Sequence, residues 1–283
     1  MSPKNSMNVL SFDIEEWFLS KDANRLPLSQ WNRLPARVEQ NTHLILSLLE
    51  KHHQKATFFI LGWIAEKYPQ LVEAILKAGH EIGYHSFQHR RPNDQSLIEF
   101  EEDLLKGIKL LETIQGSPVL YYRAPMFSLH GDARPYLDIL QDVGIVATST
   151  FNCGARFEEK IIPPHPFELA LTSGKLLEFP LVRSRAYGIR LTYSGSGYMR
   201  ILPYAFVKKQ FEQKEYNMAY FHPRDFDSSV PFHLKLGIVQ NTLNSLGNSS
   251  LANKFDQLLH DFTFLTLSDA RKAWKKTQKI SPD

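Results

Sequence analysis

The chain has 283 residues, of which 43% are hydrophobic and 22% charged, a composition typical of a folded protein with a full apolar core. The formal charge of +3 and the lack of a long Lys or Arg block argue against a nucleic-acid partner, and no run approaches the ~18 apolar residues of a membrane span. The single cysteine, Cys153, cannot form an intrachain disulfide. We therefore expect a soluble, cytoplasmic protein without a secretory signal or a transmembrane segment.

Taken in chain order, short β-rich segments alternate with longer segments of helical periodicity. The predicted strands are 8–12, 56–61, 81–84, 119–122, 145–149, 175–179, 218–221 and 262–267. The predicted helices are 36–53, 64–77, 96–113, 133–143, 203–213, 234–246, 251–261 and 268–276. A strand followed by a helix, about eight times, predicts an α/β fold with a parallel sheet, and most simply a barrel.

Three long connections interrupt this alternation, at residues 22–35, 151–166 and 182–200. The second ends in the run Ile161 to Pro166, which is too rich in proline for regular structure. Long loops on a barrel often shape the substrate mouth, so these segments are expected either to do so or to be plain surface connections.

Two histidines with the spacing of metal ligands follow the third predicted strand. In His85-Ser86-Phe87-Gln88-His89 the imidazoles are four residues apart, so a single helical turn would let both face one ion. Pro92 follows closely and disfavours a longer helix, which places the pair at a strand end. The spacing suits a metal site, but such a pair also occurs by chance, so the metal interpretation depends on further residues.

Together with this histidine pair, several chemically capable side chains follow predicted strands, where a β/α barrel forms its active site. These residues are Asp13, Glu15, Glu16, His85, His89, Arg123 and His222. One carboxylate and two imidazoles would give a three-ligand site with an open position, as expected of a hydrolytic Zn²⁺ or a similar ion. The second carboxylate, the arginine and the third histidine would then handle protons and charge.

The order of these residues resembles the polysaccharide deacetylases of carbohydrate esterase family four. The resemblance rests on the stretches Ser11-Phe12-Asp13-Ile14-Glu15, His85-Ser86-Phe87-Gln88-His89, Arg123-Ala124-Pro125-Met126-Phe127 and Tyr220-Phe221-His222-Pro223. Residues 197–204, 222–227 and 258–262 are further similar to the branch found with bacterial exopolysaccharide export loci.

The resemblance implies a single distorted (β/α)7-8 barrel that removes N-acetyl groups from amino sugars with one divalent metal. One domain would span residues 1–283, with residues 223–283 as a C-terminal extension of the barrel. Zn²⁺ is the first expectation for the metal, with Co²⁺ or Ni²⁺ as alternatives. The expected partner is an N-acetylated glycan, in a bacterial polysaccharide or its precursor, and the resemblance leaves room for association with a polysaccharide synthesis assembly.

Carried over residue by residue, the resemblance gives His85 and His89 as metal ligands, Asp13 as general base and His222 as general acid. Arg123 would hold Asp13 ionised and oriented through a charge-assisted hydrogen bond. Backbone N–H groups near Tyr122 or Met126 would help to stabilise the oxyanion.

The sequence departs from the family pattern in its first motif. The usual motif has two adjacent aspartates, base then ligand, whereas Ile14 follows Asp13 here and the next acids are Glu15 and Glu16. Because alternate residues of a strand share a face, Asp13 and Glu15 point the same way. Glu15 is therefore our third ligand, and Glu16 is the weaker candidate.

Two further departures concern the acid histidine and the groove. The family often supplies an aspartate after the fifth strand that tunes the acid histidine, but residues 147–151 contain none. Met126-Phe127 replaces the more usual aromatic residue followed by glycine. The missing aspartate and the altered first motif keep a second function open, that of a catalytically silent carbohydrate-binding protein on the same barrel. A third is a C–N hydrolase acting on a small cyclic amide.

Aromatic and other histidine side chains complete the expectations. The candidates for stacking on sugar faces are Trp17, Trp63, Tyr193 and Tyr198, with core packing the default for Trp63. The histidines interpreted as surface or structural are His43, His52, His53, His80, His130, His165, His233 and His260.

Overall fold

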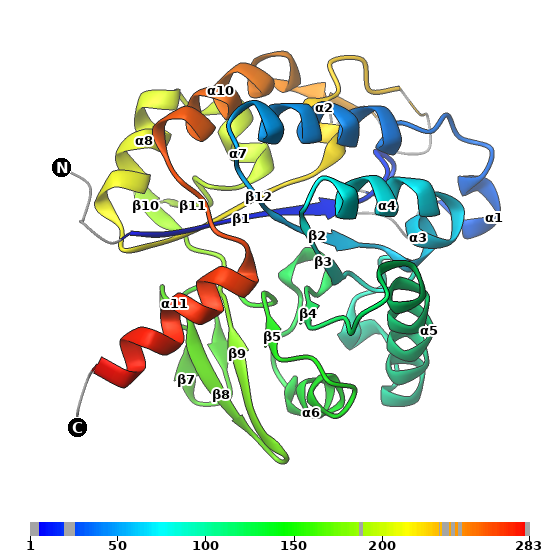
Figure 1. Ribbon diagram of the computed structural model, residues 1–283, viewed down its shortest axis with the longest axis vertical. Coiled ribbons are helices and arrows are strands. Elements are labelled where there is room, and N and C mark those ends of the chain that lie inside the picture. Colours follow the sequence, from blue (N-terminus) through cyan, green and yellow to red (C-terminus); the bar gives the residue numbers. More distant parts are fainter. Residues whose placement is uncertain are drawn as a thin grey trace.

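The computed structural model describes residues 6–19, 26–186, 189–231 and 245–280, together with residues 233, 238, 241 and 242 (Figure 1). In this described part, one eight-stranded sheet has the order β12-β1-β2-β3-β4-β5-β9-β8. Its strands are β1 (Met7–Ile14), β2 (Thr57–Ile60), β3 (Glu81–Tyr84), β4 (Tyr121–Tyr122), β5 (Ala147–Thr148), β8 (Phe167–Leu171), β9 (Gly174–Glu178) and β12 (Tyr216–Phe221). Neighbouring strands run parallel, except that β8 is antiparallel to β9. The sheet curls into a half barrel with β12 and β8 as its end strands, which confirms the predicted α/β fold of the distorted-barrel kind.

Helices cover the curled sheet (Figure 1). They are α1 (Leu28–Trp31), α2 (Val38–Lys51), α3 (Gly62–Lys67), α4 (Pro69–Lys77), α5 (Leu97–Gln115), α6 (Arg134–Asp142), α7 (Ser196–Ile201), α8 (Tyr204–Gln213), α10 (Asn248–Asp261) and α11 (Leu267–Ile280). Short 3₁₀ turns are η2 (Pro92–Asp94), η3 (Pro125–Phe127) and η4 (Pro223–Phe226). Among the described residues, no helix has the length and apolar character needed to cross a bilayer.

Local sequence explains where several helices begin and end. α5 starts with a capping box, in which Ser96 and Glu99 each accept a hydrogen bond from the other's backbone N–H, and it ends at Gly116 in the left-handed region (φ 69°). The predicted helix 64–77 is instead two helices, because Pro69 cannot continue α3 and begins α4. Most of the predicted helix 234–246 lies outside the described residues.

The long connections contain more regular structure than the sequence predicted. Within 151–166, β6 (Arg156–Phe157) and β7 (Lys160–Ile161) form a hairpin that ends before the prolines begin. Within 182–200, β10 (Ser184–Ala186) and β11 (Ile189–Leu191) form a second hairpin, followed by the start of α7.

Two segments of the alternating pattern are also corrected. The predicted strand 175–179 corresponds to β9, which is parallel to β5, but β8 before it was not predicted and pairs antiparallel with β9 across a two-residue turn. The predicted strand 262–267 makes only an isolated bridge, between Leu265 and Val9, before α11 begins at Leu267.

β1 lies in the middle of the core. Phe12 of β1 stacks on Phe58 with ring centroids 4.9 Å apart and meets Phe255 of α10 edge-on at 5.9 Å. α2 and α10 lie side by side over this region, joined by ion pairs from Lys51 and His52 to Asp256 (Figure 1). Because β1 is covered on both faces, polar side chains at its C-terminal end are buried, and that end forms the candidate site.

Candidate metal centre and active site

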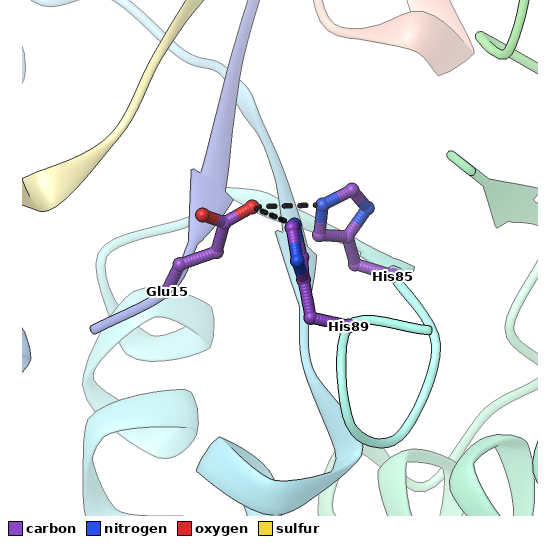
Figure 2. Close-up of side chains that lie close together, drawn as sticks. All are labelled: Glu15, His85 and His89. Atoms are coloured by element: carbon purple, nitrogen blue, oxygen red, sulfur yellow. Dashed lines mark hydrogen bonds and ion pairs between the residues drawn. The ribbon is translucent and has the colours of Figure 1, made fainter. Parts of the chain in front are cut away.

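Glu15, His85 and His89 converge at the C-terminal ends of β1 and β3 (Figure 2). Glu15 Oε1 lies 3.0 Å from His85 Nε2 and 2.9 Å from His89 Nε2. All three side chains are buried, and their ligand atoms lie within 4.8 Å of one another. The histidines do not share a helical turn, as their spacing suggested. They lie on a tight loop in which Ser86 (φ 68°) and His89 (φ 57°) have left-handed backbones, which turns both rings toward Glu15.

The hydrogen bonding of His85 makes this cluster suitable for a cation. His85 Nδ1 lies 2.8 Å from the backbone oxygen of Arg123, and because a carbonyl oxygen only accepts, Nδ1 carries the hydrogen. In the neutral ring Nε2 then has a lone pair facing the Glu15 carboxylate, which is repulsive unless a proton or a metal ion lies between them. Although burial alone lowers the pKa of His85, the nearby Asp13 and Glu15 carboxylates raise it overall.

Asp13 is held by Arg123, as the sequence predicted. Arg123 Nη1 donates to Asp13 Oδ1 at 2.7 Å, and Nη2 donates to Ser11 Oγ at 2.8 Å. The other Asp13 oxygen, Oδ2, lies 3.9 Å from His85 Nε2 and 3.8 Å from His222 Nε2. One carboxylate oxygen is thus fixed by the guanidinium while the second faces the cluster.

Glu16 occupies a different place from Glu15. Its carboxylate accepts hydrogen bonds from the backbone N–H groups of Trp17, Arg37 and Val38, and so caps the N-terminus of α2. An acid at a helix N-terminus complements the exposed N–H groups and the helix dipole. Of the two candidate carboxylates, the structure therefore brings Glu15 to the histidines.

Asp225 contacts the third histidine, and sequence reasoning missed it. Asp225 Oδ2 accepts a hydrogen bond from the His222 backbone N–H at 2.7 Å and lies 3.1 Å from His222 Nδ1. Burial alone raises the pKa of the Asp225 carboxyl, but its hydrogen bonds and the His222 and Arg200 charges lower it to about 2. The signal was an acid three residues after His222, with Pro223 at the start of the turn, which is the pattern of a capped helix start.

The segment after β5, which lacks the expected aspartate, supports Arg123 instead. Ser149 Oγ accepts from Arg123 Nη2 at 3.1 Å. The next residue, Thr150, is held through its backbone N–H by Glu178 Oε1 at 2.8 Å. The aspartate absent from this segment has a counterpart in Asp225, which reaches His222 from its own turn.

Arg224 is a second residue that the sequence analysis did not single out. Its Nη1 donates to Glu15 Oε2 at 2.5 Å, so Glu15 contacts an arginine through one oxygen and two histidines through the other. Burial alone raises the pKa of the Glu15 carboxyl, but the His89 and Arg224 charges hold it well below its usual range.

The remaining candidates divide between the core and the surface. Trp17 and Tyr193 are buried, so they are corrected from sugar-stacking candidates to core residues. Trp63 is also a core residue, packed edge-on against Trp31 with ring centroids 5.3 Å apart. Tyr198 is 38% exposed and stays a candidate for stacking on a sugar.

Sequence comparisons relate most of the chain to two family models. Residues 28–148 match the model described as polysaccharide deacetylase, and residues 154–272 match a domain of unknown function (DUF3473). His85, His89 and Arg123 lie in the first region, and the turn with His222 in the second. Asp13 and Glu15 precede both matched regions, so the site combines residues from three parts of the chain.

Curated relatives match over a short stretch. The chain is 38% identical over 80 residues to a peptidoglycan-N-acetylglucosamine deacetylase of Bacillus cereus, which covers 28% of this chain and 38% of the relative. It is 35% identical over 85 residues to a chitooligosaccharide deacetylase of Azorhizobium caulinodans, which covers 30% of this chain and 40% of the relative. The match thus spans well under half the length of either relative.

Solved structures show the same fold. A protein of Mycobacterium smegmatis assigned as a polysaccharide deacetylase aligns with a TM-score of 0.65 at 19% identity, covering 100% of this chain and 94% of that chain. A pseudoenzyme of carbohydrate esterase family four from Bacillus anthracis aligns with a TM-score of 0.51 at 14% identity, covering 95% of this chain and 66% of that chain. At these identities the likeness concerns the fold alone.

Proposed function

Because the chain belongs to the polysaccharide deacetylase family through residues 28–148, we propose that it is a metal-dependent hydrolase that removes N-acetyl groups from amino sugars. One observation carries this proposal, the convergence of Glu15 Oε1 on the Nε2 atoms of His85 and His89 at 3.0 and 2.9 Å. Two imidazoles and one carboxylate are a ligand set typical of catalytic zinc sites. A Glu15 turned away from both histidines would have favoured a silent binding protein.

The donor set fits one divalent ion, with Zn²⁺ as the first choice and Co²⁺ or Ni²⁺ as alternatives. Glu15, His85 and His89 would hold it. Such an ion, when bound, polarises the acetamide carbonyl and makes a water molecule easier to deprotonate. The two proton transfers are carried out by side chains of the protein.

Asp13 is the proposed general base. With Oδ1 engaged by Arg123 at 2.7 Å, Oδ2 faces the cluster and accepts a proton from the attacking water. Arg123 is buried, and its charge-assisted hydrogen bond holds the Asp13 carboxylate in one orientation.

His222 is the proposed general acid. Asp225 lies 3.1 Å from Nδ1 and so directs the other ring nitrogen, Nε2, toward the cluster, 3.8 Å from Asp13 Oδ2. As the water oxygen bonds to the carbonyl carbon and the C–N bond breaks, Nε2–H gives its proton to the departing amine. The products are acetate and a free amino sugar.

The substrate and its cellular setting are proposed from sequence similarity outside the metal cluster. We expect an amino sugar in a bacterial polysaccharide or its precursor, of the exopolysaccharide branch, with the reaction in the cytoplasm and in contact with a synthesis assembly. The similarity of residues 197–204, 222–227 and 258–262 to that branch supports this expectation.

Acetate release tests the proposed function directly. Chelator-treated protein is reloaded with Zn²⁺ or Co²⁺ and incubated with N-acetylglucosamine oligomers, peptidoglycan fragments, exopolysaccharide fragments and a small cyclic amide. Wild type should release acetate from the acetylated sugars. Asp13→Asn should lose about 10²–10⁴-fold in rate, the usual contribution of a general base. The exposed Asp132→Asn serves as the matched control. Unchanged acetate release from Asp13→Asn would rule out the mechanism, and turnover of the cyclic amide alone would favour the C–N hydrolase.

A further inference from the structure

Arg224 and the two imidazoles contact different oxygens of the Glu15 carboxylate. Arg224 Nη1 donates to Oε2 at 2.5 Å, while Oε1 lies 3.0 Å from His85 Nε2 and 2.9 Å from His89 Nε2. All of these atoms belong to side chains that are buried or nearly so, with the Arg224 side chain 14% exposed. The contact is thus shielded from solvent and stronger than a surface ion pair.

The position of Arg224 is fixed by the C-terminal part of the chain. Arg224 lies in η4, and its backbone oxygen accepts a hydrogen bond from Asn248 Nδ2 at 2.9 Å. Asn248 Nδ2 also donates to the Asp227 backbone oxygen at 2.8 Å, so the first residue of α10 binds two backbone oxygens of this segment. The same turn begins at His222, which places the proposed acid and the partner of Glu15 on one turn.

A glutamate at this ligand position has a freedom that an aspartate lacks. Glu15 comes two residues after Asp13 and has one more rotatable bond than the adjacent aspartate that the family resemblance leads us to expect. An unrestrained carboxylate binds metal ions through one or both oxygens. With Oε2 engaged by a guanidinium, only Oε1 faces the imidazoles.

We propose that Arg224 is a positioning residue that makes Glu15 a one-oxygen ligand of a divalent cation. The inference rests on the proposed metal-dependent function. One-oxygen coordination leaves positions open on the ion for a water molecule and for the substrate carbonyl. Arg224 thereby orients Glu15 as Arg123 orients Asp13, so each of these two carboxylates has its own arginine.

Two effects of Arg224 on metal affinity oppose each other, which makes the proposal testable. Its positive charge repels the cation, and removing it would tighten binding if charge alone mattered. Its hydrogen bond orients the ligand, and removing an outer-shell partner of this kind usually weakens metal affinity by about 10–100-fold. The proposal requires that orientation dominate.

The test is a competition titration of the protein with Co²⁺ against a chromophoric chelator, with the visible spectrum recorded at saturation. Arg224→Met should bind Co²⁺ about 10–100-fold more weakly than wild type. Its d–d bands should lose intensity, because a carboxylate that binds through both oxygens raises the coordination number. Arg90→Met, which removes a surface arginine paired with Glu99 at 3.3 Å, should match wild type.

The outcomes separate this inference from the proposed function. Equal or tighter Co²⁺ binding by Arg224→Met, with an unchanged spectrum, would overturn the positioning role while leaving the metal site in place. Failure of wild type to bind Co²⁺ would instead count against the proposed function. Circular dichroism checks folding. If Arg224→Met does not fold, Arg224→Lys decides, because it keeps the charge but not the planar fork. Its affinity should lie below that of wild type, and wild-type affinity and spectrum would overturn the inference.

Discussion

Replacing Asp225 with asparagine is the most informative single change near the acid histidine. Asp225 Oδ2 binds both the His222 backbone N–H at 2.7 Å and the Nδ1 side of its ring at 3.1 Å. Asparagine has nearly the same shape and can still accept from the backbone N–H, so the turn should keep its fold. What is lost is the negative charge beside the imidazole.

The size of the effect follows from that contact. A hydrogen bond to a charged group contributes about 1.5–3 kcal/mol, which corresponds to about 10- to 150-fold in rate at ~1.4 kcal/mol for each factor of ten. The loss should fall on kcat, because a general acid acts on the leaving amine in the transition state. KM and metal content should change little.

Steady-state acetate release measures this split. The matched control is Asp256→Asn, which removes another contact between an aspartate and a histidine, the 2.8 Å pair with His52 on the surface. Asp225→Asn should lower kcat, and Asp256→Asn should not. Equal kcat values for Asp225→Asn and wild type, or a loss confined to KM, would refute the orienting role of Asp225.

Two further predictions concern stability. Burial raises the pKa of Glu81 from 4.5 to about 7. The protonated Glu81 carboxyl therefore contributes fully to the free energy of unfolding below pH 4.5, and this contribution is lost as the pH rises through about 7. The free energy of unfolding should fall by at most about 3 kcal/mol over this range, and Glu81→Gln should flatten the dependence in urea titrations. A wild-type pH dependence in Glu81→Gln would contradict this assignment. Glu16→Gln should lower the free energy of unfolding by about 1 kcal/mol through a weaker cap on α2. Its metal content should equal that of wild type, and a loss of metal would instead make Glu16 a ligand.

The sequence predicted those parts of the molecule that depend on local pattern. The strand 81–84 matches β3 residue for residue, because the β-formers Ile82 and Tyr84 lie between a turn at Gly79 and the histidine loop. Strand alternation correctly placed Asp13 and Glu15 in the same cluster. The topological rule that parallel strands present their functional groups at one end correctly placed the histidines and Arg123 near these acids, whereas Glu16 caps α2 instead.

What the sequence did not show depends on contacts between distant segments. Arg224 and Glu15 are 209 residues apart, and nothing local marks one as the partner of the other. His85 and His89 meet on a loop with left-handed residues rather than on a helical turn, because the loop conformation is set by its surroundings. We expected an aspartate after β5 to contact His222, but the residue in contact is Asp225, which comes from a later segment of the chain.

The most direct test of the account is the metal content of the protein. Wild type, His85→Ala and the exposed control His43→Ala would be purified without chelator and analysed before and after soaking with Zn²⁺, Co²⁺ or Ni²⁺. We predict close to one ion per chain in wild type and in His43→Ala, and its loss in His85→Ala. The absence of a specific ion from wild type under every condition would contradict the metal site and turn attention to glycan binding without catalysis.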